Sequence, residues 1–277
     1  MKKLDRLVWA AGISLTSHGV RIGVRTNTPE VLSRVVAQLP VGWKFASFNV
    51  VERLYSVIQG GTSTRSNARS FHLLYADIER VERTENLDQL LESLGSDLET
   101  YIAQNTRQKL FIHAGVVAFK GSAIVFPGRS LSGKSTLAKE FLTAGAEYFS
   151  DEFAVLDAKG LVHPFPRPLS LRDADPQNGH HTRFTAAELG AQVAKRSLPV
   201  SLVVLARYKQ GARWRPRVLS RGQGVLGLIA NAVAARNQPE KALVILEKTV
   251  RQAQVLQGTR GEAKEAVESI LDYVERS

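Results

Sequence analysis

Residues 123–136 read AIVFPGRSLSGKST, and this stretch decides the fold. Four apolar residues, typical of a buried strand, run through Pro127 into a loop with glycines at positions 128 and 133. Lys134 and Ser135 follow the second glycine directly, and apolar residues then recur at helical spacing as far as Gly145. Strand, glycine-rich loop and helix in this order predict a loop that binds phosphate.

The spacing Gly-x4-Gly-Lys-Ser is a complete P-loop pattern. Its glycines let backbone N–H groups converge on phosphates, and the positive end of the following helix adds to their attraction. We expect Lys134 to reach the terminal phosphates and the Ser135 hydroxyl to bind Mg²⁺. The alternative, an ordinary glycine turn, is disfavoured by the flanking strand and helix. The predicted nucleotide-binding residues are Gly128, Arg129, Ser130, Leu131, Ser132, Gly133, Lys134, Ser135 and Thr136.

Two adjacent acids follow soon after the lysine. P-loop proteins hold their metal with a second ligand, usually an acid at the end of a neighbouring buried strand. Asp151 and Glu152 follow a short apolar segment, so the predicted helix must return directly to the strand that carries them. One acid could bind Mg²⁺ while the other accepts a proton from an attacking hydroxyl. Either could instead be a solvated turn residue, Glu152 more readily than Asp151.

The strand before the loop carries a histidine. Residues 110–119 read LFIHAGVVAF and are expected to form a hairpin with residues 123–126. A histidine on an apolar strand is more often a core residue with its hydrogen bonds satisfied than a catalytic one. Because His113 lies at a fixed spacing ahead of the loop, we weigh a catalytic or phosphate-contacting role equally with a role in the core.

Together these features resemble the catalytic domain of HPr kinase/phosphorylase and its shorter HPr-kinase-like relatives, which share a P-loop core with phosphoenolpyruvate carboxykinase. The resemblance covers residues 111–171 and rests on Ile-His-Ala-Gly at 112–115, the hairpin entering the loop and the acidic pair; HPFPRPLS at 163–170 is similar to a segment of the shorter relatives. It implies an α/β (α+β) P-loop kinase core with a smaller N-terminal α+β domain. It also implies transfer of the γ-phosphate of ATP, with Mg²⁺, to a serine- or threonine-type hydroxyl of a peptide, protein or small molecule.

The resemblance also implies a role for each site residue. Asp151 matches the position proposed as the base, Glu152 the neighbouring acid near the metal, and His113 a histidine close to the transferred phosphate. The family's pair is typically Asp-Asp, whereas this chain has Asp-Glu, so the choice of metal ligand between the two acids stays open. The later glycine-rich signature of true HPr kinase/phosphorylases is absent, which weakens the case for HPr as acceptor and for the reverse phosphorolysis. A peptide or small-molecule hydroxyl is at least as well supported as HPr. The predicted catalytic residues are Asp151, Lys134 and His113, and the predicted metal ligands are Ser135, Glu152 and Asp151.

Composition predicts a folded, basic protein. The 277 residues are 44% hydrophobic, and 37 Lys and Arg against 26 Asp and Glu give a net charge of +11. The absence of cysteine excludes disulfides, thiolate nucleophiles and cysteine-ligated metals. No apolar run approaches the length of a membrane span, and Asp5 and Arg6 interrupt a start that otherwise mimics a signal peptide. We expect a soluble, cytoplasmic protein with no membrane partner.

Most of the charge lies in the second of two predicted domains, 1–105 and 106–277. The first shows a hairpin at 13–24, a helix at 28–39, a strand at 48–58 and a helix at 87–102, and suggests no chemistry. The second is the predicted P-loop kinase domain. It continues with a buried strand at 201–206, a helical pattern from Ser220 to Ala234 and two C-terminal helices near 240–256 and 262–275. Those last helices would pack against the sheet or against another subunit, which leaves a homo-oligomer open.

A basic tract lies in the second domain, where residues 191–238 contain no acid. It could line the rim of the active site and bind nucleotide or an acidic substrate, or it could be a solvated face; nucleic acid is the disfavoured alternative. An alternative function is therefore an ATP-binding module that hydrolyses slowly or not at all and holds an anionic partner through this tract. Its cations are Lys195, Arg196, Arg207, Lys209, Arg213, Arg215, Arg217, Arg221 and Arg236.

Overall fold

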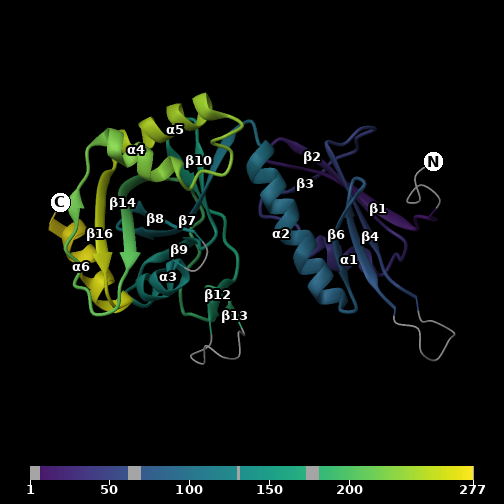
Figure 1. Cartoon of the computed structure of the whole chain (residues 1–277), viewed down its shortest axis with the longest axis horizontal. Coiled ribbons are helices and arrows are strands. Elements are labelled where there is room, and N and C mark those ends of the chain that lie inside the picture. Colours follow the sequence, from purple (N-terminus) through teal and green to yellow (C-terminus); the bar gives the residue numbers. More distant parts are fainter. Residues whose placement is uncertain (1–6, 62–69, 130–131, 173–180, 277) are drawn as a thin grey trace. The chain divides into compact units, whose positions relative to one another are not determined.

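The computed structural model describes residues 7–61, 70–129, 132–172 and 181–276. The chain divides into two compact units, Met1–Gln108 and Lys109–Ser277. Each unit combines β-sheet with helices (Figure 1), so the fold is mixed α and β as predicted. Among the described residues, no helix is both long and apolar enough to cross a membrane.

Unit 1 is built on a six-stranded sheet in the order β3-β1-β2-β4-β5-β6. Its predicted first hairpin is confirmed by the antiparallel pairing of β1 and β2, whereas β2 and β4 are parallel. The helix expected at 28–39 is shorter, because α1 spans only Val31–Val36 and lacks a side-chain cap. The strands are β1 (Ala11–Ser17), β2 (Val20–Thr26), β3 (Lys44–Phe45), β4 (Arg53–Ile58), β5 (His72–Ala76) and β6 (Glu79–Thr84).

The helix predicted at 87–102 is confirmed as α2 (Leu87–Asn105). It begins where the Asn86 side chain accepts hydrogen bonds from the backbone N–H groups of residues 88 and 89, as expected for an N-cap. Its apolar face, spaced three to four residues apart, is buried and packs in unit 1. This face comprises Leu90, Leu91, Leu94, Leu98 and Ile102.

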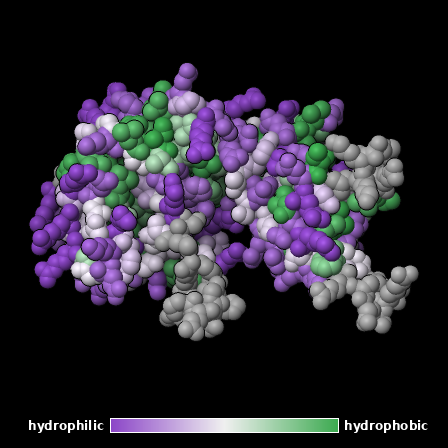
Figure 2. All heavy atoms as spheres, viewed as in Figure 1, coloured by the Kyte–Doolittle hydropathy of each residue, from purple (hydrophilic) through white to green (hydrophobic). Residues whose placement is uncertain are grey.

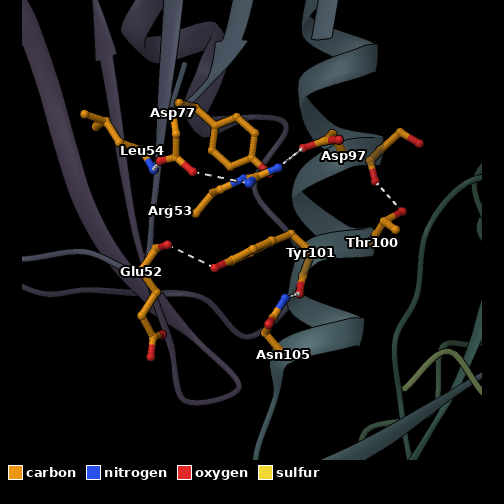
Figure 3. Close-up of polar contacts among 10 residues, drawn as sticks. Glu52, Arg53, Leu54, Asp77, Asp97, Thr100, Tyr101 and Asn105 are labelled. Carbon is orange, nitrogen blue, oxygen red and sulfur yellow. Dashed lines mark hydrogen bonds and ion pairs between the residues drawn. The ribbon is translucent and has the colours of Figure 1, made fainter. Parts of the chain in front are cut away.

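A polar network also ties α2 to the sheet (Figure 3). The hydroxyl of buried Tyr55 donates to Asp97 at 2.7 Å, and the Arg53 guanidinium lies 3.2 Å from Asp77 and 4.0 Å from Asp97. Arg53 also stacks over the Tyr101 ring at 4.7 Å. Burial, followed by the neighbouring Asp97, raises the pKa of Tyr55, so this hydroxyl keeps its proton and remains a donor.

Unit 2 contains an eight-stranded sheet in the order β11-β10-β7-β8-β14-β16-β15, with β9 paired to β7 and β11 also paired to β14. The predicted hairpin is confirmed as β7 and β8, and β14 runs parallel to both β8 and β16. The strands are β7 (Lys109–Phe119), β8 (Ser122–Pro127), β9 (Glu147–Ser150), β10 (Phe153–Asp157), β11 (Leu161–His163), β14 (Leu198–Tyr208), β15 (Arg217–Val218) and β16 (Gln254–Arg260); β12 (Leu169–Arg172) and β13 (His181–Phe184) pair separately.

Four helices cover the two faces of this sheet. One buried cluster joins apolar residues of α4 (Arg221–Ile229) and α5 (Pro239–Gln252) to the strands, and a second joins α3 (Lys134–Thr143) and α6 (Ala263–Arg276) to the opposite face. Figure 1 shows α4 and α5 together and α3 and α6 together. The predicted helical pattern of 220–234 is shorter than expected: it starts at the Ser220 capping box but ends at Ile229.

The prediction of a helix at 240–256 is wrong at its C-terminal end. Helix α5 ends at Gln252, and residues 254–260 form β16, which runs parallel to β14 in the sheet. Val255 and Leu256 continue the helical spacing of α5, but both are buried as strand residues. The sheet therefore contains a parallel strand that the apolar periodicity alone did not separate from the helix.

Some apolar residues of unit 2 remain exposed. Figure 2 shows hydrophobic side chains gathered over α4 and α5, where Leu226, Leu243 and Val244 are exposed. Apolar residues at these positions are compatible with the expected packing against another subunit, which stays a prediction.

Candidate functional site

The predicted phosphate loop lies between β8 and α3. Gly133 has a φ of 83°, in the left-handed region that glycine adopts readily, and directly precedes the first residue of α3. The Gly128 N–H donates to the His113 carbonyl at 3.0 Å, which fixes the start of the loop to β7. The first N–H groups of α3 have no partner within the helix, as phosphate binding requires. Of the predicted loop residues, Ser130 and Leu131 lie outside the described residues.

Lys134 lies at the N-terminus of α3. Its ammonium group donates to the Arg129 carbonyl at 3.0 Å, so the side chain folds back along the loop. Burial lowers the pKa of Lys134, while the nearby Glu152 and Asp151 oppose that shift. A positive group held in this position can move onto the phosphates of a bound nucleotide.

Ser135 and Asp151 are brought together by the structure. The Ser135 hydroxyl donates to Asp151 Oδ2 at 2.6 Å, and Oδ1 of the same carboxylate is buried without a hydrogen-bond partner. Asp151 is 8% exposed, and this burial raises its pKa to about 6. A buried carboxylate oxygen with no donor, beside a hydroxyl, is a suitable ligand pair for Mg²⁺.

Glu152 and His113 form a second pair beside the first. Both acids lie in the bend between β9 and β10, but Glu152 faces the imidazole, with 3.8 Å between its Oε1 and His113 Nδ1. Both side chains are about half exposed. Burial lowers the pKa of His113, so this imidazole is neutral at pH 7 and able to accept a proton. The predicted site residues therefore meet, but the two acids have different neighbours.

One further residue, which the sequence did not indicate, contacts the loop. Arg260, the last residue of β16, donates to the Gly133 carbonyl at 3.3 Å. Its only sequence signal is a short apolar run, Val255-Leu256, followed by Gly258 and a basic residue. This signal points to a site residue only when residues 254–260 are known to form a parallel strand. In open α/β sheets, ligands bind at the carboxyl ends of the parallel strands, which is where Arg260 lies.

A cleft lies on the other side of β8 from the acids. It has a volume of about 440 Å³ and reaches Pro127, the residue before the loop. A second cavity of about 310 Å³ shares Leu205, Arg217 and Gln257 with it. Two arginines of the basic tract line the first cleft, and no acid does. The first cleft is lined by Pro127, Leu205, Ala206, Arg207, Arg217, Gln257, Gly258 and Thr259.

The described residues hold no cluster of three or more His, Cys, Asp and Glu side chains suited to a metal. The Ser135–Asp151 pair supplies two oxygen ligands, which suits a cation that keeps several waters and also binds the substrate's phosphates. Comparison of the sequence with protein-family models and with curated proteins finds no match.

Proposed function

We propose that this chain is an ATP- and Mg²⁺-dependent phosphotransferase of the HPr-kinase-like type, acting on a serine- or threonine-type hydroxyl of a peptide, protein or small molecule. The observation that carries the proposal is the Ser135 hydroxyl bonded to a buried carboxylate with one free oxygen, at the start of the helix after the loop. A turn with only a structural role has no need of an unpartnered buried carboxylate oxygen.

The geometry favours one division of labour between the acids. Ser135 and Asp151 would hold Mg²⁺, which supplies charge neutralisation for the phosphates when bound. Asp151 is then unsuited to be the base, although the family resemblance implies that role for it. The Ser135 hydroxyl bonds to Asp151, whereas Glu152 faces His113. We therefore assign acceptance of the acceptor's proton to the Glu152–His113 pair.

The sheet order suggests where the two substrates lie. In-line transfer needs the attacking hydroxyl and the leaving diphosphate on opposite sides of the γ-phosphorus. The acids follow β9, beyond β7, whereas the cleft lies at β14 and β16, on the other side of β8. We therefore assign the acceptor to the acid side and the nucleoside to the cleft, where Arg207 and Arg217 can stack on a base.

The proposed step balances as follows. The acceptor oxygen forms a bond to the γ-phosphorus, and the bond from that phosphorus to the β–γ bridging oxygen breaks. The hydroxyl proton passes to the Glu152–His113 pair, and ADP leaves with the bridging oxygen. Lys134 and the N–H groups at the start of α3 stabilise the charge on the phosphate oxygens throughout.

A labelled-phosphate assay tests the proposal. Purified full-length chain is incubated with γ-labelled ATP, Mg²⁺ and a panel of acceptor peptides, proteins and small hydroxyl compounds. We expect label on at least one acceptor, a loss of about 100-fold or more in Asp151→Asn and Glu152→Gln, and a wild-type rate in Glu147→Gln, an exposed acid on β9.

Two results would redirect the assignment. Nucleotide binding without transfer to any acceptor, together with steeply salt-dependent binding of an anionic partner, favours the alternative of an ATP-binding module. Full transfer by Glu152→Gln and His113→Asn together removes the proposed base. Nucleotide affinity separates the acids, because Asp151→Asn weakens Mg²⁺-ATP binding whereas Glu152→Gln lowers turnover alone.

A further inference from the structure

Arg260 carries a positive charge in an unusual place. It is 3% exposed, and among the described residues it is the only buried lysine or arginine. It ends β16, and its guanidinium reaches the loop in front of α3. Figure 1 labels β16 and α3 in the same unit, and the hydrogen bond from Arg260 joins the end of this strand to the residue before this helix.

Among the described residues, the hydrogen-bond partners of the guanidinium are all neutral. Nη2 donates to the Gly133 carbonyl at 3.3 Å and Nη1 to the Gly261 carbonyl at 2.9 Å, while Nε is buried without a partner. The Tyr208 ring lies 5.3 Å away. The charge of Glu262 opposes the lowering of the Arg260 pKa. Glu262 is exposed, however, and no ion pair joins the two among the described residues.

Such a charge is costly in the free protein. A buried cation is normally paired with a carboxylate, because carbonyl oxygens alone compensate only part of the lost hydration. Burial accordingly lowers the pKa of Arg260, although a guanidinium remains charged in proteins. A phosphate bound at the loop would supply the missing negative charge. Arg260 contacts Gly133, and Gly133 directly precedes Lys134, the residue expected to reach the phosphates.

We propose that Arg260 is a positioning residue for the phosphate loop whose buried charge is compensated when a polyphosphate binds there. Its guanidinium holds the Gly133 carbonyl in place. Its positive charge makes the affinity of the loop for a ligand rise with the number of phosphate charges on that ligand. The proposal rests on the part of the proposed function that has the loop bind a polyphosphate, and not on transfer to an acceptor.

The test measures binding and free-state stability together. Isothermal titration gives the affinities of the full chain for tripolyphosphate, ATP, ADP and AMP, and chemical unfolding gives the stability without ligand. The variants are Arg260→Met, Arg260→Lys, and Arg251→Met, an exposed arginine of α5 outside the basic tract, whose loss removes the same charge. We expect Arg260→Met to bind tripolyphosphate at least about 30-fold more weakly, with a flattened series from AMP to ATP.

Free-state stability distinguishes this role from a structural one. Arg260→Met is expected to be at least as stable as wild type without ligand, since an uncompensated charge is gone, and to lose the anion-induced stabilisation. Arg260→Lys keeps the charge and retains the dependence on phosphate number, while Arg251→Met behaves as wild type.

Several outcomes overturn the proposal. Wild-type tripolyphosphate affinity in Arg260→Met does so, as does a destabilised variant that keeps its anion-induced stabilisation, because Arg260 is then only a structural contact. Loss of the dependence on phosphate number in Arg260→Lys also overturns it. If the wild-type chain binds neither tripolyphosphate nor ATP, the proposed function falls as well; binding without transfer removes only the kinase step.

Discussion

Asp151 combines deep burial with a hydroxyl partner, and in the proposed function its ionised form would be the one that holds Mg²⁺. With a pKa of about 6, the carboxyl is protonated in the folded chain at mildly acidic pH, whereas it ionises near 4 in the unfolded chain. The raised pKa means that the folded state binds more protons between these values. Stability from this group is therefore fully present below pH 4 and lost as the pH rises through about 6.

We expect the wild-type free energy of unfolding, relative to that of Asp151→Asn, to fall by about 2.5 kcal/mol between pH 4 and pH 7.5. Urea unfolding at closely spaced pH values measures this difference. Glu147→Gln, which replaces an exposed carboxylate, should give a curve parallel to wild type. A constant difference between wild type and Asp151→Asn across the range would show that Asp151 ionises normally.

Residue patterns in the sequence predicted one side of the site and missed the other. Lys134, Ser135 and Asp151 could be placed together because they lie on one loop–helix–strand unit, where connections are short and spacing limits geometry. Arg260 is 127 residues from the glycine that it contacts. That contact depends on which strands neighbour each other, and local spacing carries no such information.

At the scale of elements, the starts of α2 and α4 were predicted correctly, whereas α1 starts at Val31, three residues after the predicted start, and has no side-chain cap. Helix α2 starts at its Asn86 cap and α4 at its Ser220 capping box, because a side chain there satisfies backbone donors at a defined position. Strand β16 was missed because two apolar residues fit both the end of a helix and a buried strand. Its neighbours on the sheet decide between the two, and these neighbours come from distant parts of the chain.

The anchoring of α2 offers a test of an element held by a polar contact. Tyr55 is fully buried, and its hydroxyl donates to Asp97 of α2, so removing the hydroxyl leaves this carboxylate with the Arg53 guanidinium 4.0 Å away. We expect Tyr55→Phe to lower the free energy of unfolding by about 1.5–3 kcal/mol, as for a hydrogen bond to a charged group. Asp97→Asn should also destabilise, because Arg53 loses a carboxylate neighbour.

The two effects should be less than additive in the double variant. A double-mutant cycle by chemical unfolding is expected to give a coupling of about 1 kcal/mol between Tyr55 and Asp97. Tyr75→Phe, on neighbouring β5, changes the same group without this contact and should be close to neutral. Strict additivity would show that the hydroxyl contributes independently of the helix.

At the scale of the whole molecule, the candidate site belongs to one unit. The loop, both acids, His113, Arg260 and the cleft all come from residues 109–277. The two large apolar clusters that support the sheet of this unit are also composed only of its own residues. A core complete within one unit is what independent folding requires.

We therefore expect residues 109–277, produced alone, to unfold in a single cooperative transition and to bind Mg²⁺-ATP within about threefold of the full chain. Circular dichroism melting and isothermal titration measure the two properties. Arg260→Met in this fragment should weaken tripolyphosphate binding by the same factor as in the full chain, since its contacts are all retained. A fragment that folds cooperatively but binds Mg²⁺-ATP more than tenfold more weakly would show that residues 1–108 contribute to the nucleotide site. Transfer measured with both forms then assigns the acceptor: a fragment that binds ATP normally yet transfers no phosphate places acceptor recognition in unit 1.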